Sequence, residues 1–476
     1  MPDNLPKVAI VSLGCSKNQV DSEVMGWRLV KSGYQLTSQP IEADIVIINS
    51  CGFIQPAREE TIETILEMGE LKREGYIKKI VVVGCMGERY REEMVRELPE
   101  VDLWAGVGEF PIIDRILNHR QGVFFSGETF LIGTEGRLIF NSPFHAYIKL
   151  SEGCNQRCAF CAIPSFKGKL QSRPIFQIVD EVKRLIDSGY RDFSLIAQDS
   201  SSYLWERGER FGLLKLIEEL EQFANRNVTF RIQYLYPNTT TPQLIKGIAQ
   251  STVVENYFDF PLQHISRSVL KIMKRDISPK QLNQLLELMG KMGVHLRTTL
   301  LVGHPGEGEK EFQELMEFVK NSPFHRFALF QYSDEEGTVA HTYPAQLKVP
   351  PELASERLEQ LGEVVKQRER EWLSRLVGKI VEGYLEGSTA DHLFYIGRPT
   401  FWSPEIDGDL LVNEVVNTVE GEKKGEEWQI KKGKRESEKN STNPINLQVG
   451  GRYRFKITQL VGDELLATLL FDKKGM

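Results

Sequence analysis

The sequence predicts an α/β protein in three parts: an open parallel α/β sheet, a partial (β/α)6 barrel and a small all-β barrel. Apolar segments alternate with helical patterns three times within residues 5–125 and six times within residues 140–372. Such alternation is typical of parallel sheets covered by helices. Within residues 373–476 the pattern changes to short strands separated by Gly and Pro turns, which is typical of a small barrel.

In the first part, each of three β-branched apolar segments ends just before a cysteine. The segments are Lys7–Leu13, Asp44–Asn49 and Lys79–Val83, and the cysteines are Cys15, Cys51 and Cys85. The carboxyl ends of parallel strands meet at one edge of a sheet, where ligands bind. Because neighbouring strands lie about 4.7–4.9 Å apart, we expect these three thiols to share one iron–sulfur cluster. The alternative is three buried cysteines that pack as small hydrophobic side chains.

The middle part contains six predicted strands, and the active site of such a barrel lies at their carboxyl ends. The strands are Ala146–Leu150, Asp192–Ala197, Thr229–Leu235, Tyr257–Leu262, Leu296–Val302 and Phe327–Tyr332. Gln198 and Asp199 follow the second strand, and Gln263 and His264 follow the fourth. We therefore expect these four side chains near the site, although a lone histidine is more often structural.

A second group of cysteines follows the first barrel strand with the spacing Cys-x3-Cys-x2-Cys: Cys154, Cys158 and Cys161. Cysteine is the usual ligand of iron–sulfur clusters, and three thiolates leave the fourth iron of a 4Fe-4S cluster open. An open iron can chelate S-adenosylmethionine and reduce its sulfonium to give a 5′-deoxyadenosyl radical. A zinc site is the alternative, but it needs a fourth ligand, and no Cys or His stands at such a spacing.

Composition narrows the class of protein. The chain has 476 residues, a net charge of -7 and a pI near 5.8, which is not typical of a tight nonspecific nucleic-acid binder. We read no signal peptide and no apolar stretch that could span a membrane, so we expect a cytoplasmic protein. Disulfides are rare in the cytoplasm, which favours metal ligation for the six cysteines.

Residues 418–446 are rich in Glu, Lys, Gly, Ser and Asn, a composition that predicts a solvated, mobile insert.

Several motifs resemble those of the radical S-adenosylmethionine methylthiotransferases, in the RimO branch. The matching stretches are Leu13–Glu23, Asn49–Ile54, Val83–Met86, Tyr147–Cys154, Pro261–His264, Tyr332–Thr338 and Pro404–Gly408. The resemblance covers essentially the whole chain except the charged insert. It implies an amino-terminal methylthiotransferase domain, a radical SAM barrel and a carboxyl-terminal TRAM domain, which is an OB-like barrel.

The resemblance also implies two 4Fe-4S clusters, the first with an open iron that carries the sulfur to be transferred. One S-adenosylmethionine methylates that sulfur, and another generates the radical that removes hydrogen from the substrate carbon. Phe160 is similar to an aromatic near the adenine, with simple packing as the alternative, and Gln198 and Asp199 stand where the superfamily binds the methionyl end. Gln263 is expected on the same wall, and no side chain is assigned as catalytic.

The implied substrate is the β-carbon of an aspartate in ribosomal protein S12, free or within the small ribosomal subunit. We expect an electron donor such as flavodoxin or ferredoxin, no membrane and a monomer. The sequence departs from the family pattern at His304, at Ser200–Trp205 and at Lys274–Asp276, none of which is a cluster ligand.

Three other functions stay open. The first is a tRNA adenosine methylthiotransferase of the same architecture, which should favour a basic terminal barrel. Here the charges of that part are about balanced and the turn Ser403–Asp409 is acidic, which suits a basic protein partner better. The second is an iron–sulfur electron carrier, which would not consume S-adenosylmethionine. The third is an RNA-binding module, which predicts a basic surface with interleaved aromatic residues that the sequence lacks.

Overall fold

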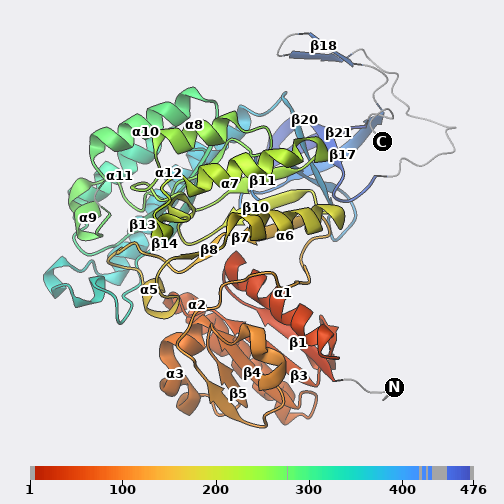
Figure 1. The fold of residues 1–476 in the computed structure, drawn as a ribbon. Helices are drawn as coiled ribbons and strands as arrows, with labels where there is room; N and C mark the ends of the chain where they lie inside the picture. The colour runs from red at the N-terminus through yellow and green to blue at the C-terminus, as the bar shows by residue number, and fades with distance from the viewer. Residues whose placement is uncertain (1–5, 276, 418–420, 425–426, 431–446, 472–476) are drawn as a thin grey trace.

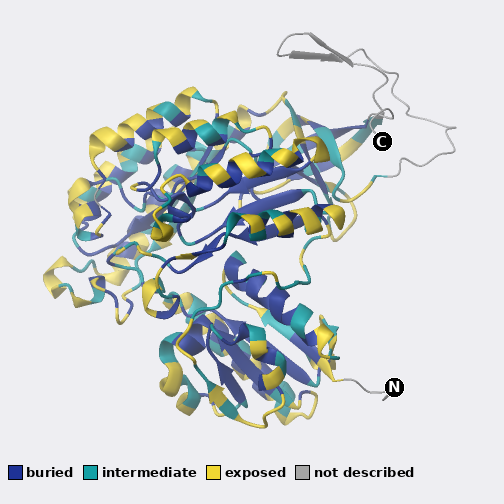
Figure 2. Cartoon of the chain, viewed as in Figure 1, coloured by how far each residue is buried: buried dark blue, intermediate teal, exposed yellow. Residues whose placement is uncertain are grey.

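The computed structural model describes residues 6–275, 277–417, 421–424, 427–430 and 447–471 (Figure 1). The chain forms three regions in sequence order: an amino-terminal α/β layer structure, a central region of six parallel strands with outer helices, and a carboxyl-terminal β barrel. This confirms the predicted fold class. Strands are mostly buried and outer helix faces exposed (Figure 2). In the described residues, no helix has the length and apolar character needed to cross a membrane.

The amino-terminal region is a six-stranded parallel sheet with strand order β2-β1-β3-β4-β5-β6. Its strands are β1 (Lys7–Ser12), β2 (Gln35–Thr37), β3 (Ile45–Ser50), β4 (Lys79–Gly84), β5 (Leu103–Ala105) and β6 (Gly122–Phe124). Its helices are α1 (Ser16–Lys31), α2 (Gln55–Arg73), α3 (Cys85–Glu97) and α4 (Ile113–Ile116). Every residue of β3 is buried, because helices cover both faces of the sheet, each over its own apolar cluster.

The central region holds two three-stranded parallel sheets, β11-β10-β7 and β12-β13-β14. Their strands are β7 (His145–Lys149), β10 (Asp192–Ile196), β11 (Thr229–Ile232), β12 (Tyr257–Asp259), β13 (His295–Val302) and β14 (Arg326–Gln331). The sheets meet where the backbone N–H of Leu235 donates to Asp259 O at 2.8 Å. The six predicted strands are therefore present, and together they form the curved sheet of a partial barrel.

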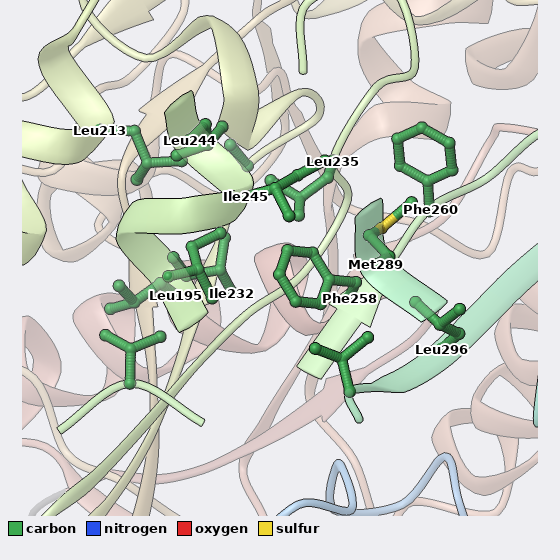
Figure 3. Close-up of a cluster of buried hydrophobic side chains, with 14 of the residues drawn as sticks. Leu195, Leu213, Ile232, Leu235, Leu244, Ile245, Phe258, Phe260, Met289 and Leu296 are labelled. Atoms are coloured by element: carbon green, nitrogen blue, oxygen red, sulfur yellow. The ribbon is translucent and has the colours of Figure 1, made fainter. Parts of the chain in front are cut away.

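Helices cover the outside of the central strands: α6 (Ile175–Asp187), α7 (Gly212–Leu220), α8 (Pro242–Gln250), α9 (Arg267–Ile272), α10 (Pro279–Lys291) and α11 (Glu309–Asn321). Figure 3 shows apolar side chains of the strands packing against those of α7, α8 and α10. The labelled residues there include Leu195, Ile232, Phe258, Leu296, Leu244 and Met289.

Helix α12 (Pro351–Ser374) leads to a closed barrel with strand order β15-β16-β17-β21-β20. Its strands are β15 (Ile380–Ser388), β16 (Tyr395–Pro399), β17 (Leu410–Asn417), β20 (Arg452–Val461) and β21 (Glu464–Phe471). The closed barrel agrees with the TRAM prediction. Most of the predicted insert, 418–446, lies outside the described residues. Within it, β18 (Gly421–Lys424) and β19 (Glu427–Ile430) form an antiparallel pair.

The small barrel packs against the amino ends of the central strands through buried polar contacts. Arg398 of β16 and Arg231 of β11 both pair with Asp192, the first residue of β10. The hydroxyl of Tyr384 donates to Thr229 Oγ1 at 2.8 Å. Burial alone would raise the pKa of Asp192, but the two guanidinium groups outweigh burial and lower that pKa to about 2. The carboxyl group is therefore ionised, and the interface is held by paired charges.

Candidate functional site

The first three cysteines lie at the carboxyl ends of three neighbouring strands, as predicted. Cys15 follows β1, Cys51 follows β3 and Cys85 follows β4, and these strands are adjacent in the sheet. The loops touch: a Cβ added to Gly14 would stand 2.8 Å from Cys51 Sγ, and one on Gly52 would stand 2.7 Å from Met86 Cα. Glycine is required at residue 14, where φ is +84° and no side chain fits. We call these three residues the first triad.

Asn18 ties the three loops of the first triad together. Its amide nitrogen donates to Leu13 O at 3.0 Å and to Ser50 O at 3.1 Å. Its amide oxygen lies 3.7 Å from Cys85 Sγ, and its backbone carbonyl accepts from Asn49 Nδ2 at 2.8 Å. One side chain on the first turn of α1 therefore positions the ends of β1 and β3 and contacts the cysteine that follows β4.

The second triad, Cys154, Cys158 and Cys161, lies in one loop after β7 and the short strand β8 (Ser151–Glu152). Gly153 has φ +76° and its backbone packs so closely on Lys169 O that a Cβ would stand 2.3 Å away. Arg275 Nη1 lies 3.1 Å from Cys158 Sγ, and Ala159 is held by backbone bonds to Met273 and Ala340. The Cys158 thiol and the backbone beside it are therefore held by residues that follow β12 and β14.

Both triads line one cavity of about 450 Å³, a volume typical of small-molecule sites. Its wall includes residues from the amino-terminal sheet, the barrel strands and the turn that carries Ile406. The structure thus brings together six cysteines that span residues 15–161, and it does so without a disulfide among them.

The donor set fits iron–sulfur clusters. Burial in largely apolar surroundings raises the pKa of Cys51 to about 11 and the pKa values of Cys85, Cys154 and Cys161 to about 12. Such thiols release protons when a cation binds them. In the described residues, no three Cys, His, Asp or Glu side chains converge closely enough for one metal ion, as zinc would need. In a cluster each thiolate binds a different iron, so the ligands stand further apart.

The structure places three of the four predicted cofactor residues on the cavity wall: Phe160, Gln198 and Gln263. Asp199 lies one layer behind it, where its carboxylate accepts from Gln156 Nε2 at 2.8 Å and from Ser202 Oγ at 2.5 Å. His264 is fully buried and accepts from Ser266 N at 2.9 Å, which is a structural position.

Sequence reasoning missed the basic residues of the cavity wall: Lys17, Lys167, Arg275 and Arg297. No Asp or Glu stands among the described residues of that wall. Behind it, Lys149 Nζ bonds Asp21 at 2.5 Å and Glu152 at 2.7 Å, all three fully buried. Burial alone would raise the pKa of Glu152, but Lys149 and Lys167 outweigh burial and lower it to about 2. Asp21 lies on α1, whereas Lys149 and Glu152 lie on β7 and β8, so the ion pair between the two regions becomes evident only in the folded structure.

The acidic turn Ser403–Asp409 is only partly a surface feature, unlike the acidic face that we predicted from the sequence. Asp407 is buried, its carboxylate accepts from Ser403 N at 2.8 Å, and it lies 3.8 Å from Arg297 Nε. Gln233 Nε2 donates to Ser403 Oγ at 2.5 Å. The turn reaches the barrel interior and uses one of its carboxylates there, so its acidity is weaker evidence for a basic partner.

Comparison with known proteins supports this picture. Residues 7–106 match the model described as uncharacterized protein family UPF0004, and residues 148–319 match the radical SAM superfamily. The chain is 45% identical over 465 residues to the ribosomal protein uS12 methylthiotransferase RimO of Nitratiruptor sp., covering 97% of this chain and 99% of that protein. It is 47% identical to the RimO of Aliarcobacter butzleri, covering 97% of each.

Among solved structures, the radical S-adenosylmethionine methyltransferase TsrM of Kitasatospora setae is similar with a TM-score of 0.54 and 12% identity. The match covers 76% of this chain and 89% of that one. At this identity the likeness concerns the fold alone. The superfamily assignment of the central region therefore rests on the family model over residues 148–319.

Proposed function

We propose that this protein transfers a methylthio group to the β-carbon of an aspartate in ribosomal protein S12. The chain belongs to the RimO family of radical SAM methylthiotransferases. Membership makes the chain an enzyme and a transferase that uses S-adenosylmethionine and a 4Fe-4S cluster. The substrate, the second cluster and the residue roles belong to the proposal. The observation that carries it is the meeting of two cysteine triads at one cavity.

The three regions of the fold take distinct roles in the proposal. Residues 5–125 form the methylthiotransferase domain, residues 140–372 the radical SAM domain and residues 373–476 the TRAM domain. The first triad (Cys15, Cys51, Cys85) would hold an auxiliary 4Fe-4S cluster, and the second (Cys154, Cys158, Cys161) the cluster that binds S-adenosylmethionine. When bound, these groups supply the sulfur to be transferred and the reductive cleavage of S-adenosylmethionine.

The side chains around the triads prepare the cavity for that chemistry. The guanidinium of Arg275 donates to Cys158 Sγ at 3.1 Å and so orients this ligand. Phe160, Gln198 and Gln263 are the cofactor-binding side chains on the wall, and Asp199 orients Gln156 beside them. The apolar part of the wall, which includes Phe53, Ile163 and Phe166, limits the access of water to the cavity.

The proposed partners follow from the same family. The substrate is ribosomal protein S12 or the small ribosomal subunit, the reductant is a flavodoxin or ferredoxin, and the protein works as a cytoplasmic monomer. A tRNA substrate is the second candidate, but relatives at 41–47% identity over nearly the whole chain carry the uS12 name.

The test is mass spectrometry of substrates after anaerobic reaction of the reconstituted enzyme with S-adenosylmethionine, sulfide and a reductant. A peptide of ribosomal protein S12 and an unmodified tRNA are offered together. We expect a methylthio group on the peptide's aspartate and none on the tRNA. Modification of the tRNA alone would replace the proposed substrate, and cofactor cleavage without either product would reject both.

A further inference from the structure

Lys17 occupies an unusual position for a cation. It lies in the first turn of α1, two residues after Cys15, and only 9% of the residue is exposed. The amino end of a helix carries partial positive charge, so an ammonium group there is disfavoured by both the helix dipole and burial. A compensating anion is therefore expected next to it.

The described part of the protein places no carboxylate in direct contact with the Lys17 ammonium. In the part of the chain that the structure describes, no carboxylate lies within ion-pairing distance of Lys17 Nζ, and its contact is the ring of Tyr234 at 4.0 Å. Tyr234 belongs to the barrel side of the cavity and has φ +62°, a strained backbone for a tyrosine. The Lys17 side chain therefore reaches from the loop of the first triad to the barrel side of the cavity.

The other three cations of the cavity wall already have partners. Lys167 Nζ lies 3.6 Å from both Asp21 and Glu152, and Arg297 pairs with Asp259 at 3.0 Å. Arg275 contacts Cys158 Sγ. Lys17 is the one cation of the described wall without an ion pair or hydrogen bond to a carboxylate or a sulfur; Cys15 and Glu152 act on it electrostatically, without a direct bond.

We propose that Lys17 binds the side-chain carboxylate of the substrate aspartate. This inference rests on the proposed function and names the residue that recognises its substrate. A lysine is a compact point charge, and a charge-assisted bond to a carboxylate in a cavity with a largely apolar wall is strong. The carboxylate is bonded to the β-carbon, so holding it at Lys17 also keeps that carbon in the cavity that both triads line. Lys17 would then select aspartate over asparagine.

An alternative role for Lys17 is to balance the negative charge of the first triad's thiolates. That role predicts equal effects on every substrate, whereas carboxylate binding predicts an effect that depends on the substrate's charge. The two are separated by combining a change in the enzyme with a change in the peptide.

The experiment measures peptide binding by fluorescence anisotropy to anaerobically reconstituted wild type, Lys17→Met and Lys17→Gln. The probes are a labelled ribosomal protein S12 peptide with its target aspartate and the same peptide with asparagine there. Lys183→Met, which changes an exposed lysine on α6, is the matched control. Iron content is measured for each protein, and Lys17→Arg is used as well in case the neutral variants do not load iron.

We expect wild type and Lys183→Met to bind the aspartate peptide roughly tenfold to a hundredfold more tightly than the asparagine peptide. Lys17→Met and Lys17→Gln should bind both alike, and Lys17→Arg should keep a preference for aspartate. The role of Lys17 would be wrong, with the proposed function unaffected, if wild type bound both peptides equally or if a neutral variant still preferred the aspartate peptide. An equal loss of affinity for both peptides in the neutral variants would also contradict it. Failure of the wild type to bind either peptide would overturn the proposed substrate as well.

Discussion

The two cysteine triads reach the same cavity by opposite routes. The second comes from one loop of eight residues, whose ligands are close in sequence before the chain folds. The first is assembled from three loops separated by 36 and 34 residues and exists only once β1, β3 and β4 lie side by side. The local triad can be recognised by its spacing, whereas the dispersed triad depends on sheet topology. The dispersed triad should therefore be more sensitive to changes in the surrounding fold.

The largest expected effect comes from removing one ligand of each triad. Cys158→Ala should reduce both cleavage of S-adenosylmethionine and methylthio transfer to background, because we propose that the second triad holds the cluster that reduces the cofactor. Cys15→Ala should spare cleavage and abolish transfer. Both activities are measured on the same reconstituted protein by chromatography of 5′-deoxyadenosine and mass spectrometry of the peptide. Thiomethylation by Cys15→Ala would make the auxiliary-cluster assignment wrong.

Substitution of Gly14 perturbs the dispersed triad without changing a ligand. Gly14→Ala would force a methyl group against Cys51 at a φ of +84°, so we expect about four irons per chain instead of about eight. Gly75→Ala is the matched control, because its φ is +88° but a Cβ there meets open space. A Gly14→Ala protein with full iron content would show that the dispersed triad tolerates distortion.

The thiols should also differ in reactivity when the protein is free of metal. Cys15 is exposed, so iodoacetamide should label it first, while Cys51 and Cys85 are buried. Burial raises the pKa of Cys51 to about 11 and of Cys85 to about 12. Because only the thiolate reacts, labelling of these two should rise roughly tenfold per pH unit from pH 7 to pH 9. Peptide mapping measures each rate, and pH-independent labelling of Cys85 would contradict its environment.

A smaller effect is expected from loosening the contact between the first-triad region and the barrel. Glu335 is buried, pairs with Arg58 and with Arg89 at 2.9 Å, and accepts from the backbone N–H of Gln55 at 2.9 Å. Glu335→Gln keeps the shape but removes the charge, so transfer should slow roughly threefold to tenfold while cofactor cleavage stays constant. Glu336→Gln, an exposed neighbour, is the control. Equal slowing of both activities would place Glu335 in barrel stability instead.

The sequence predicted the parallel strands and both triads because those signals are local: an apolar segment, then a cysteine. It also predicted that β1, β3 and β4 would present their ends together, which the strand order confirms. The short strands β2, β5 and β6 have only three residues each, too few for a periodic pattern to emerge. The burial of Asp407 was missed because its partners, Ser403 and Arg297, include one that is 110 residues away in sequence. Lys17 was missed for the same reason, since its contact with Tyr234 crosses between two regions.

The most direct test of the two-triad account is the iron and sulfide content of the anaerobically reconstituted protein beside a variant with Cys154, Cys158 and Cys161 all changed to alanine. If each triad holds its own four-iron cluster, the parent contains about eight irons and the variant about four. About four irons in the parent and none in the variant would contradict it, because the first triad would then be structural.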